Sequence, residues 1–451
     1  VLKSLRILGF HPDTKQPIGI KIRKPGKAFK FVKFIKCGEK EVECPNDFYK
    51  LDEDEQLTLV RDAFSLKDFK FIIILQFTMK KNILLLILLL LISVFIYGVV
   101  VGVYEIFPYD ALDSIKSITL NEKIKSDQQS MVYENNMSEL IHIKNKNDIF
   151  KLKNDLINFI WKNNGFPSSK LPDSVDMNIS NSLYSNFQNL QRIDQINILM
   201  ENNINSISYL FIPESSNNKL IIYHQGHGGD FYKGKETIQF FLKQDYTVLA
   251  FSMPLLGMND QPIVEVPDIG TIKLTSHEHL RFLESSNLSP IKFFMEPITI
   301  SLNYLDKTYN FSSYDMIGIS GGGWTVTLYS AIDDRVSQTY SIAGSVPIYL
   351  RSIAENRGDY EQWLPELYQT ANYLDLYIMS SYGEDRKFIQ IFNKYDSCCF
   401  SGEFYKTYEN EIKESLFTLN KGHFDIFLDD THKTHKISDH ALEIIIQSMA
   451  N

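Results

Sequence analysis

One serine stands in a setting that suits nucleophilic catalysis. The residues Gly318-Ile319-Ser320-Gly321-Gly322 fit the pattern G-x-S-x-G. They lie between an apolar run at 314–319, which predicts a strand, and a helical pattern at 321–332. A sharp strand-to-helix turn holds the serine in strained backbone, and its neighbours must be small to avoid clashes. The chemistry expected here is attack by the Ser320 hydroxyl on a carbonyl carbon.

A serine hydroxyl needs a base to take its proton and a third group to orient that base. Asp396 follows an apolar run at 387–392, and His423 follows a short apolar run at 416–419. If both runs are strands of one parallel sheet, Asp396 and His423 lie at the edge where such sheets place their functional groups. We therefore expect Ser320 to be the nucleophile, His423 the base and Asp396 the acid.

A glycine-rich stretch, His224-Gln225-Gly226-His227-Gly228-Gly229-Asp230, follows another apolar run at 219–223. Glycines let backbone N–H groups approach an oxyanion closely. We expect one donor from His227 or Gly228 and the second from Gly321, directly after the nucleophile. A phosphate-binding loop is the alternative, but the stretch lacks both the Lys-Ser/Thr of a P-loop and the spacing G-x-G-x-x-G.

These residues need a sheet that brings the ends of distant strands together. From residue 149 onward, short apolar runs alternate with helical patterns, which predicts a buried, mostly parallel sheet flanked by helices in an α/β fold. Two β-rich runs at 191–201 and 206–213, separated by Asn202-Asn203, predict a hairpin that adds an antiparallel edge. Further strands are expected at 219–224, 246–252, 337–343, 387–392 and 416–419, and helices at 232–243, 290–305, 403–415 and 439–449.

With these motifs in place, residues 148–451 resemble the α/β-hydrolase superfamily, in its esterase and dienelactone-hydrolase-like branch. The resemblance implies a serine hydrolase with the triad Ser320, Asp396 and His423 and no metal or organic cofactor. The run Gly321-Gly322-Gly323-Trp324 is richer in glycine than most members of the superfamily, and we expect Trp324 to pack the helix.

Three further features leave alternatives open. The aromatic-rich segment 351–379 lies where this fold commonly inserts a cap, but ordinary helix packing explains it equally well. Cys398 and Cys399 follow Asp396 closely, and we expect two buried thiols rather than a strained vicinal disulfide. The histidines 277, 279, 432, 435 and 440 lack the spacing H-E-x-x-H, so we interpret them as solvated loop residues and expect no metal site.

Composition supports a globular protein of two or three structural units. Of the 451 residues, 44% are hydrophobic and 22% are charged, which excludes disordered and collagen-like chains. The net charge of −9 argues against a general nucleic-acid binder. Four cysteines are too few for a disulfide scaffold.

Residues 83–104 form a run of 22 residues without a charge, which is long enough for a helix to span a bilayer. No small-residue cleavage site follows the run, so we expect residues 79–104 to be an uncleaved single-pass signal anchor. Lys80 and Lys81 precede the run, while Glu105 and Asp110 follow it. The positive-inside rule then predicts an extracytoplasmic catalytic domain.

The segments on either side of this run differ in character. Residues 105–148 are polar and predict a stalk, and residues 149–451 form the expected catalytic domain. Residues 1–78 carry 15 basic and 11 acidic side chains, whereas the other 373 residues carry 31 and 44. Because of this contrast, we interpret residues 1–78 as a basic extension that is a fused fragment or an upstream read-through.

The sequence therefore predicts a membrane-anchored serine hydrolase that cleaves carboxylic esters of a small-molecule or acylated substrate through an acyl-enzyme on Ser320. A peptidase or thioesterase would use the same triad. From another class, a non-catalytic binding module could keep the same fold, and loss of a triad member would favour it.

Overall fold

The computed structural model describes residues 4–10, 17–23, 30–34, 89–98, 101, 137–162, 164–351 and 357–450. The chain divides into two compact units, Val1–Ile106 and Phe107–Asn451. Each unit is described by itself below.

The first unit contains a three-stranded antiparallel sheet in the order β1-β2-β3, built from Ser4–Phe10, Pro17–Arg23 and Lys30–Phe34. Residues 89–98 are helical. Within the described residues, no helix combines the length and the apolar character that a membrane crossing requires. The expected anchor at 79–104 and the expected stalk at 105–148 lie largely outside the described residues, as does most of the extension at 1–78.

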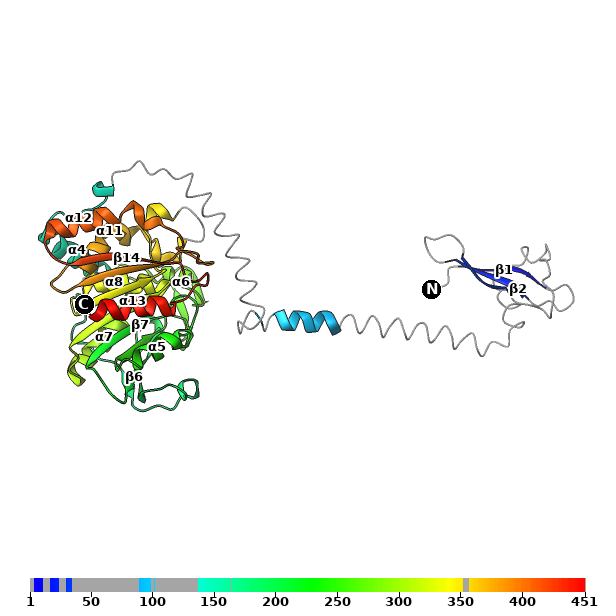
Figure 1. Ribbon diagram of the computed structural model, residues 1–451, viewed down its shortest axis with the longest axis horizontal. Coiled ribbons are helices and arrows are strands. Elements are labelled where there is room, and N and C mark those ends of the chain that lie inside the picture. The colour runs from blue at the N-terminus through cyan, green and yellow to red at the C-terminus, as the bar shows by residue number, and fades with distance from the viewer. Residues whose placement is uncertain are drawn as a thin grey trace. The chain divides into compact units, whose positions relative to one another are not determined.

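The second unit alternates strands and helices along the chain (Figure 1). Its strands are β4 Ser174–Asp176, β5 Leu190–Leu199, β6 Asn205–Pro213, β7 Lys219–His224, β8 Thr247–Phe251, β9 Ile263–Val266, β10 Gly270–Lys273, β11 Ser313–Ile319, β12 Val336–Ile342, β13 Lys387–Asn393 and β14 His423–Asp429. Its helices are α4 Lys146–Trp161, α5 Lys235–Leu242, α6 His277–Leu280, α7 Lys292–Thr308, α8 Gly321–Ile332, α10 Pro365–Thr370, α11 Tyr373–Ser381, α12 Glu409–Leu419 and α13 Asp439–Ala450.

Nine strands form one sheet in the order β14-β13-β12-β11-β7-β8-β6-β5-β4. The six strands from β14 to β8 in this order are parallel, whereas β6, β5 and β4 form an antiparallel edge. The chain passes from β7 to β8 on one side and then returns to β11 on the other. The carboxyl ends of β7 and β11 therefore flank a topological switch point, where sheets of this kind bind their ligands. The predicted mostly parallel α/β fold and its antiparallel hairpin are confirmed.

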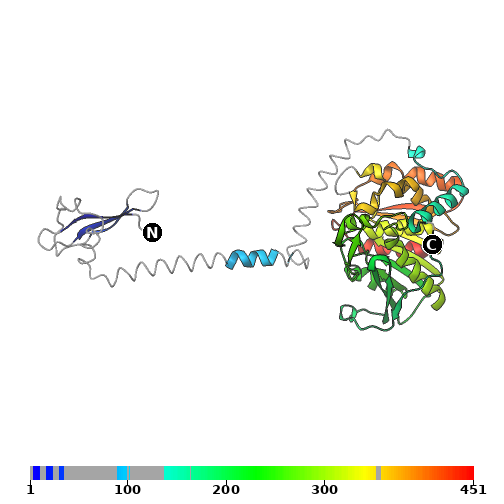
Figure 2. The same ribbon diagram turned by 180° about the vertical axis from the view of Figure 1, so that it is seen from behind.

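Helices cover both faces of this sheet (Figure 1), and Figure 2 shows the same unit from behind. Successive residues of β7 point to opposite faces, because side chains alternate along a strand. Leu220 and Ile222 join the apolar cluster that contains buried residues of α4, α7, α8, α11 and α12. Ile221 and Tyr223 join the second cluster, which contains buried residues of α5 and α13.

The last strand of the sheet differs from the prediction. The apolar run 416–419 is the final turn of α12, in which Ile412 and Leu416 are buried one helical turn apart. Asn420 ends the helix in the left-handed conformation, with φ 57°. The strand itself begins at His423 and runs to Asp429. The carboxyl end of the last strand therefore lies at Asp429, ten residues after the expected end at residue 419.

The expected cap segment packs as part of the core. The α11 helix lies against α8, and all nine of its residues are buried. Tyr368, Tyr373 and Tyr377 belong to the same apolar cluster as α8. Among residues 351 and 357–379, the structure therefore supports ordinary helix packing rather than a separate cap; residues 352–356 lie outside the described part.

Candidate active site

Ser320 occupies the sharp turn that the motif predicted. It lies between the last residue of β11 and the first residue of α8, with φ 57° and ψ −127°. This backbone conformation is strained for any residue other than glycine and occurs where function requires it. The Ser320 N–H donates to the Ile342 carbonyl at 2.9 Å, and its carbonyl accepts from the Trp324 N–H at 3.1 Å. The turn is thus held from β12 and from α8.

The glycines around Ser320 are required because neighbouring backbone atoms lie too close to leave room for a β-carbon. A β-carbon on Gly318 would lie 2.2 Å from the carbonyl oxygen of Gly322, and one on Gly322 would lie 2.1 Å from that of His224. A β-carbon on Gly323 would lie 2.8 Å from the α-carbon of Gly344. These distances explain the long glycine run at the start of α8.

The loop after β7 is pressed against the same turn. A β-carbon on Gly226 would lie 2.6 Å from Ser320 Cβ, and one on Gly321 would lie 2.4 Å from His227 Cε1. Gly321 begins α8, so its N–H has no partner within the helix. His227 and Gly321 are therefore neighbours, as the oxyanion prediction requires. A β-carbon on Gly228 would meet only Gln225 and Lys233, at 3.6 and 3.8 Å.

Asp396 lies three residues beyond β13 and is fully buried. Its Oδ1 accepts the Cys398 N–H at 2.8 Å, and its Oδ2 accepts the Asn393 amide at 3.1 Å. The same Oδ2 lies 2.7 Å from Nδ1 of His435. Asp396 is thus positioned to orient a histidine, but that histidine is not His423.

The assignment of His423 as base is wrong, because the structure places it at the opposite edge of the sheet. His423 is the first residue of β14 and pairs with Lys387, the first residue of the parallel strand β13. Its side chain is exposed, and its N–H donates to the Arg386 carbonyl at 3.0 Å. Ser320 and Asp396 both follow the carboxyl ends of their strands, about 20 Å away at 3.3 Å per residue.

His435 takes the place that was expected of His423. It lies in the loop between β14 and α13, which follows the carboxyl end of the last strand. This loop is tied to the Asp396 loop by two hydrogen bonds, from the Ser397 N–H to the Lys433 carbonyl at 3.1 Å and from the Asn393 amide to the Lys436 carbonyl at 2.9 Å. No local motif marks His435, and only its position after the true last strand identifies it. The interpretation of His435 as a solvated residue is also wrong.

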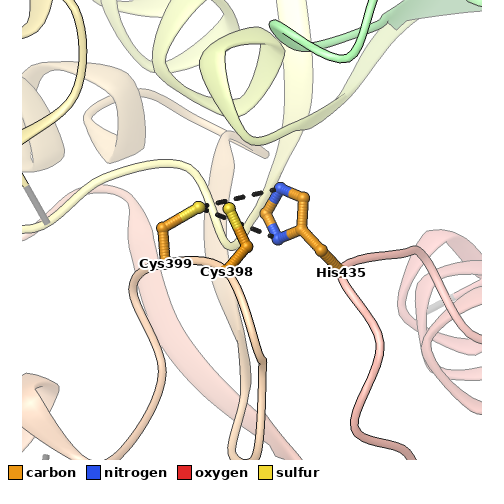
Figure 3. A group of neighbouring side chains, drawn as sticks. All are labelled: Cys398, Cys399 and His435. Carbon is orange, nitrogen blue, oxygen red and sulfur yellow. Dashed lines mark hydrogen bonds between the residues drawn. The ribbon is translucent and has the colours of Figure 1, made fainter. Parts of the chain in front are cut away.

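Cys399 lies beside the ring of His435 (Figure 3). Its sulfur lies 4.0 Å from Nδ1 and 3.9 Å from Nε2 of His435, and Ser320 is one of the side chains that influence the pKa of its thiol. Because the sulfur is equally far from both ring nitrogens, it does not lie in line with either one. No disulfide joins Cys398 and Cys399. The hydrogen bond with Cys398 and burial raise the pKa of the Cys399 thiol well above its usual value, so the thiol is neutral.

A second group of polar side chains lies beside the loop after β7, residues 225–230, which is the expected oxyanion loop. His227 Nε2 lies 2.9 Å from Glu361 Oε1, and His277 Nδ1 lies 3.2 Å from the same oxygen. His277 is 1% exposed and Glu361 is fully buried, so the interpretation of His277 as a solvated residue is wrong. Burial alone would raise the pKa of Glu361, but His277 and His227 lower it to about 2. Burial alone would lower the pKa of His227, but Glu361 and Asp359 raise it.

Two groups in the described part of the chain have side chains suited to a metal ion. One comprises Cys398, Cys399 and His435, and the other comprises His227, His277, Asp359 and Glu361. Trp324 contributes to neither group: it is buried in the core and donates to the Tyr368 hydroxyl at 2.7 Å, as expected of a packing residue.

No protein-family model matches the sequence, and no curated protein matches it. Among solved structures, an esterase from Pyrococcus furiosus is similar at 16% identity and a TM-score of 0.39, with 62% of this chain and 96% of that chain covered. Acetyl xylan esterase 1 from Thermoanaerobacterium is similar at 13% identity and a TM-score of 0.45, with 69% and 96% covered. A methylesterase is similar at 12% identity and a TM-score of 0.48, with 74% and 68% covered.

Proposed function

We propose that this protein is a carboxylic ester hydrolase that works through an acyl-enzyme on Ser320. The observation that carries the proposal is the meeting of three chain segments at one edge of the sheet. These are the strained turn at Ser320, the buried carboxylate of Asp396 and the ring of His435 that the carboxylate holds. Cys399 contacts His435, and Ser320 influences the pKa of its thiol, which supports a short path between the hydroxyl and the ring.

The catalytic roles of Asp396 and His435 follow from which ring nitrogen of His435 binds the carboxylate. Asp396 binds Nδ1 of His435, which fixes the tautomer with the proton on Nδ1 and leaves the lone pair on Nε2. Nε2 then takes the proton of Ser320 as the hydroxyl attacks the ester carbonyl. His435 returns this proton to the leaving alcohol and afterwards deprotonates the water that releases the acid.

The negative charge that develops on the carbonyl oxygen needs donors that are already in place. Gly321 offers an N–H at the amino end of α8, and the loop residue next to it, His227, offers the second. Loss of one such donor typically costs about 10²–10³-fold in kcat. Gly228 is a less suitable second donor, because its surroundings are Gln225 and Lys233.

A fluorophosphonate probe tests this proposal. We expect the probe to label wild-type protein at Ser320 and to leave Ser320→Ala unlabelled, while Ser215→Ala, which changes an exposed serine, is labelled like wild type. A panel of p-nitrophenyl esters, thioesters and peptide anilides then identifies the acyl substrate. Faster turnover of the thioesters or anilides than of the esters would replace the ester assignment and keep the nucleophile. A folded protein that is neither labelled nor active on any of these substrates would overturn the proposal.

We also propose that residues 83–104 anchor the chain in a membrane, with the catalytic unit outside the cytoplasm. The support is the uncharged run of 22 residues and the lysines that precede it. The full-length protein should stay with membranes in alkaline carbonate and should be digested by protease added to intact cells or spheroplasts. Recovery in the carbonate supernatant, or protection of the catalytic unit, would contradict anchoring or orientation respectively.

A further inference from the structure

Four potential metal ligands converge beside the oxyanion loop from three separate parts of the chain. His227 lies in the loop after β7, His277 begins α6, and Asp359 and Glu361 lie at the short helix Tyr360–Gln362. One ligand atom from each residue lies within 4.8 Å of the others. None of the four takes part in the proposed proton transfers.

The contacts of His277 favour a cation in this group. Nε2 of His277 lies 2.9 Å from the Pro254 carbonyl, which can only accept, so Nε2 carries a proton. In a neutral ring, Nδ1 then bears a lone pair, yet Nδ1 faces Glu361 Oε1 at 3.2 Å and Asp359 Oδ2 at 3.5 Å. A lone pair facing two carboxylate oxygens is repulsive. A metal ion bound between Nδ1 and the two oxygens would remove this repulsion.

The buried carboxylate of Glu361 needs strong partners at both of its oxygens. Its Oε1 lies within hydrogen-bond distance of one ring nitrogen of each histidine, whereas its Oε2 is buried and makes no hydrogen bond with the described residues. A fully buried carboxylate carries a large desolvation cost unless strong partners surround it. A divalent cation, which binds a carboxylate through one or both oxygens, would meet this requirement.

The separations fit tetrahedral zinc. Bonds of about 2.0–2.1 Å at tetrahedral angles place neighbouring ligand atoms roughly 3.3 Å apart. His227 Nε2 lies 2.9 Å from Glu361 Oε1 and 3.2 Å from Asp359 Oδ2. The corresponding separations from His277 Nδ1 are 3.2 and 3.5 Å. The bond from His277 Nε2 to a backbone carbonyl is the outer contact that metal-bound histidines usually make.

We propose that His227, His277, Asp359 and Glu361 bind a zinc ion. Four protein ligands close the coordination sphere, so the ion is structural and does not activate water. Its effect is to fasten the oxyanion loop, through His227, to α6 and to the segment that carries Glu361. His227 lies against Gly321, so the zinc site positions the loop next to the nucleophile. Imidazole and carboxylate ligands also admit Co²⁺, which reports on the site spectroscopically.

Metal binding by the full-length protein tests the inference without reference to activity. Chelator-treated wild type should take up one Zn²⁺ at this site, and Co²⁺ should give visible d–d absorption without thiolate charge-transfer bands. His277→Ala and Glu361→Gln should each weaken binding by at least about 100-fold, which is the upper range for losing only an outer partner. His279→Ala changes a half-buried histidine two residues away, which is outside the group of four, and should bind like wild type.

The group of Cys398, Cys399 and His435 is the alternative place for a bound ion. Zn²⁺ uptake that is lost in Cys398→Ser and kept in His277→Ala would place the ion at Cys398, Cys399 and His435 and overturn the assignment. Wild type that binds neither ion would also overturn the assignment. If His277→Ala does not fold, Asp359→Asn replaces it, because the Asp359 side chain is 47% exposed.

Discussion

The position of the base can be tested by replacing three histidines one at a time. In His435→Gln, the side-chain amide can still hydrogen-bond Asp396 but cannot take the proton of Ser320. Loss of the base in a serine triad lowers kcat by about 10⁴–10⁶-fold, which corresponds to about 5–8 kcal/mol of transition-state stabilisation. His432→Gln is the control within the same loop, because His432 contacts Asp429 rather than Asp396.

His423→Gln tests the opposite edge of the sheet. Six steps along β14 at 3.3 Å each separate His423 from the carboxyl end of the strand, which is about 20 Å. A unit charge at that distance acts across water with only about 0.2 kcal/mol. The variant should therefore change kcat by less than about 1.5-fold.

The assay is the steady-state hydrolysis of p-nitrophenyl acetate by the three variants and wild type, with thermal unfolding as the check on folding. The amount of fluorophosphonate label per mole of protein gives the fraction of molecules with a reactive serine. A folded His435→Gln protein with wild-type kcat would refute the assignment of His435. Loss of activity in folded His423→Gln would refute the inference that His423 lies too far from Ser320 to take part in catalysis.

Three further predictions concern other parts of the same region. Gly322→Ala should destabilise the protein by about 1–3 kcal/mol or more, measured by denaturant unfolding, because the new β-carbon would lie 2.1 Å from the His224 carbonyl oxygen. Burial raises the pKa of Asp315 from 3.8 to about 6, so the folded state holds this proton more tightly and wild-type stability falls as the pH rises through this range. The free energy of unfolding of Asp315→Asn, relative to wild type, should rise by up to about 3 kcal/mol between pH 4 and pH 7.5, and no change would contradict the burial argument. Iodoacetamide should alkylate the exposed Cys398 well before Cys399 at pH 7.5, because the Cys399 thiol is partly buried and its pKa is raised. Peptide mapping would follow the two rates, and equal rates would contradict this order.

Local patterns were sufficient for the strand-to-helix turn at Ser320 and for most of the sheet. The strand Lys219–His224 and the helix Gly321–Ile332 have the predicted bounds, and the hairpin turns at Asn202-Asn203 as expected. In each case the pattern is strong: an uninterrupted apolar run, a G-x-S-x-G turn, or two asparagines that tolerate positive φ.

His435, the base of the proposed mechanism, was missed because a four-residue apolar run does not distinguish a strand from a helical turn. In 416–419, Leu416 is buried but Phe417 is 86% exposed, a combination that belongs to a helix with one buried face. The true strand carries Asp425 and Asp429 among its apolar residues and therefore lacked a continuous apolar signal. The error in one element displaced the expected histidine from 435 to 423.

The zinc-site residues were missed for a different reason. His227, His277 and Glu361 are separated by 50 and 84 positions and share no spacing motif. Their proximity depends on how α6 and the Glu361 segment pack over the loop after β7, which is a tertiary arrangement. Burial of His277 is equally invisible in the local sequence, since its neighbours Glu278 and His279 are polar.

The tie between the two loops has a consequence for how activity arises during synthesis. A chain that has left the ribosome as far as the loop after β13 already contains the serine turn and Asp396, but not the imidazole. His435 arrives only after β14, and the contacts of Asn393 and Ser397 with residues 433 and 436 fix its loop only when β14 has joined the sheet. Under the proposed mechanism, a nascent or prematurely released chain of this protein is therefore inert toward esters until its edge strand is in place.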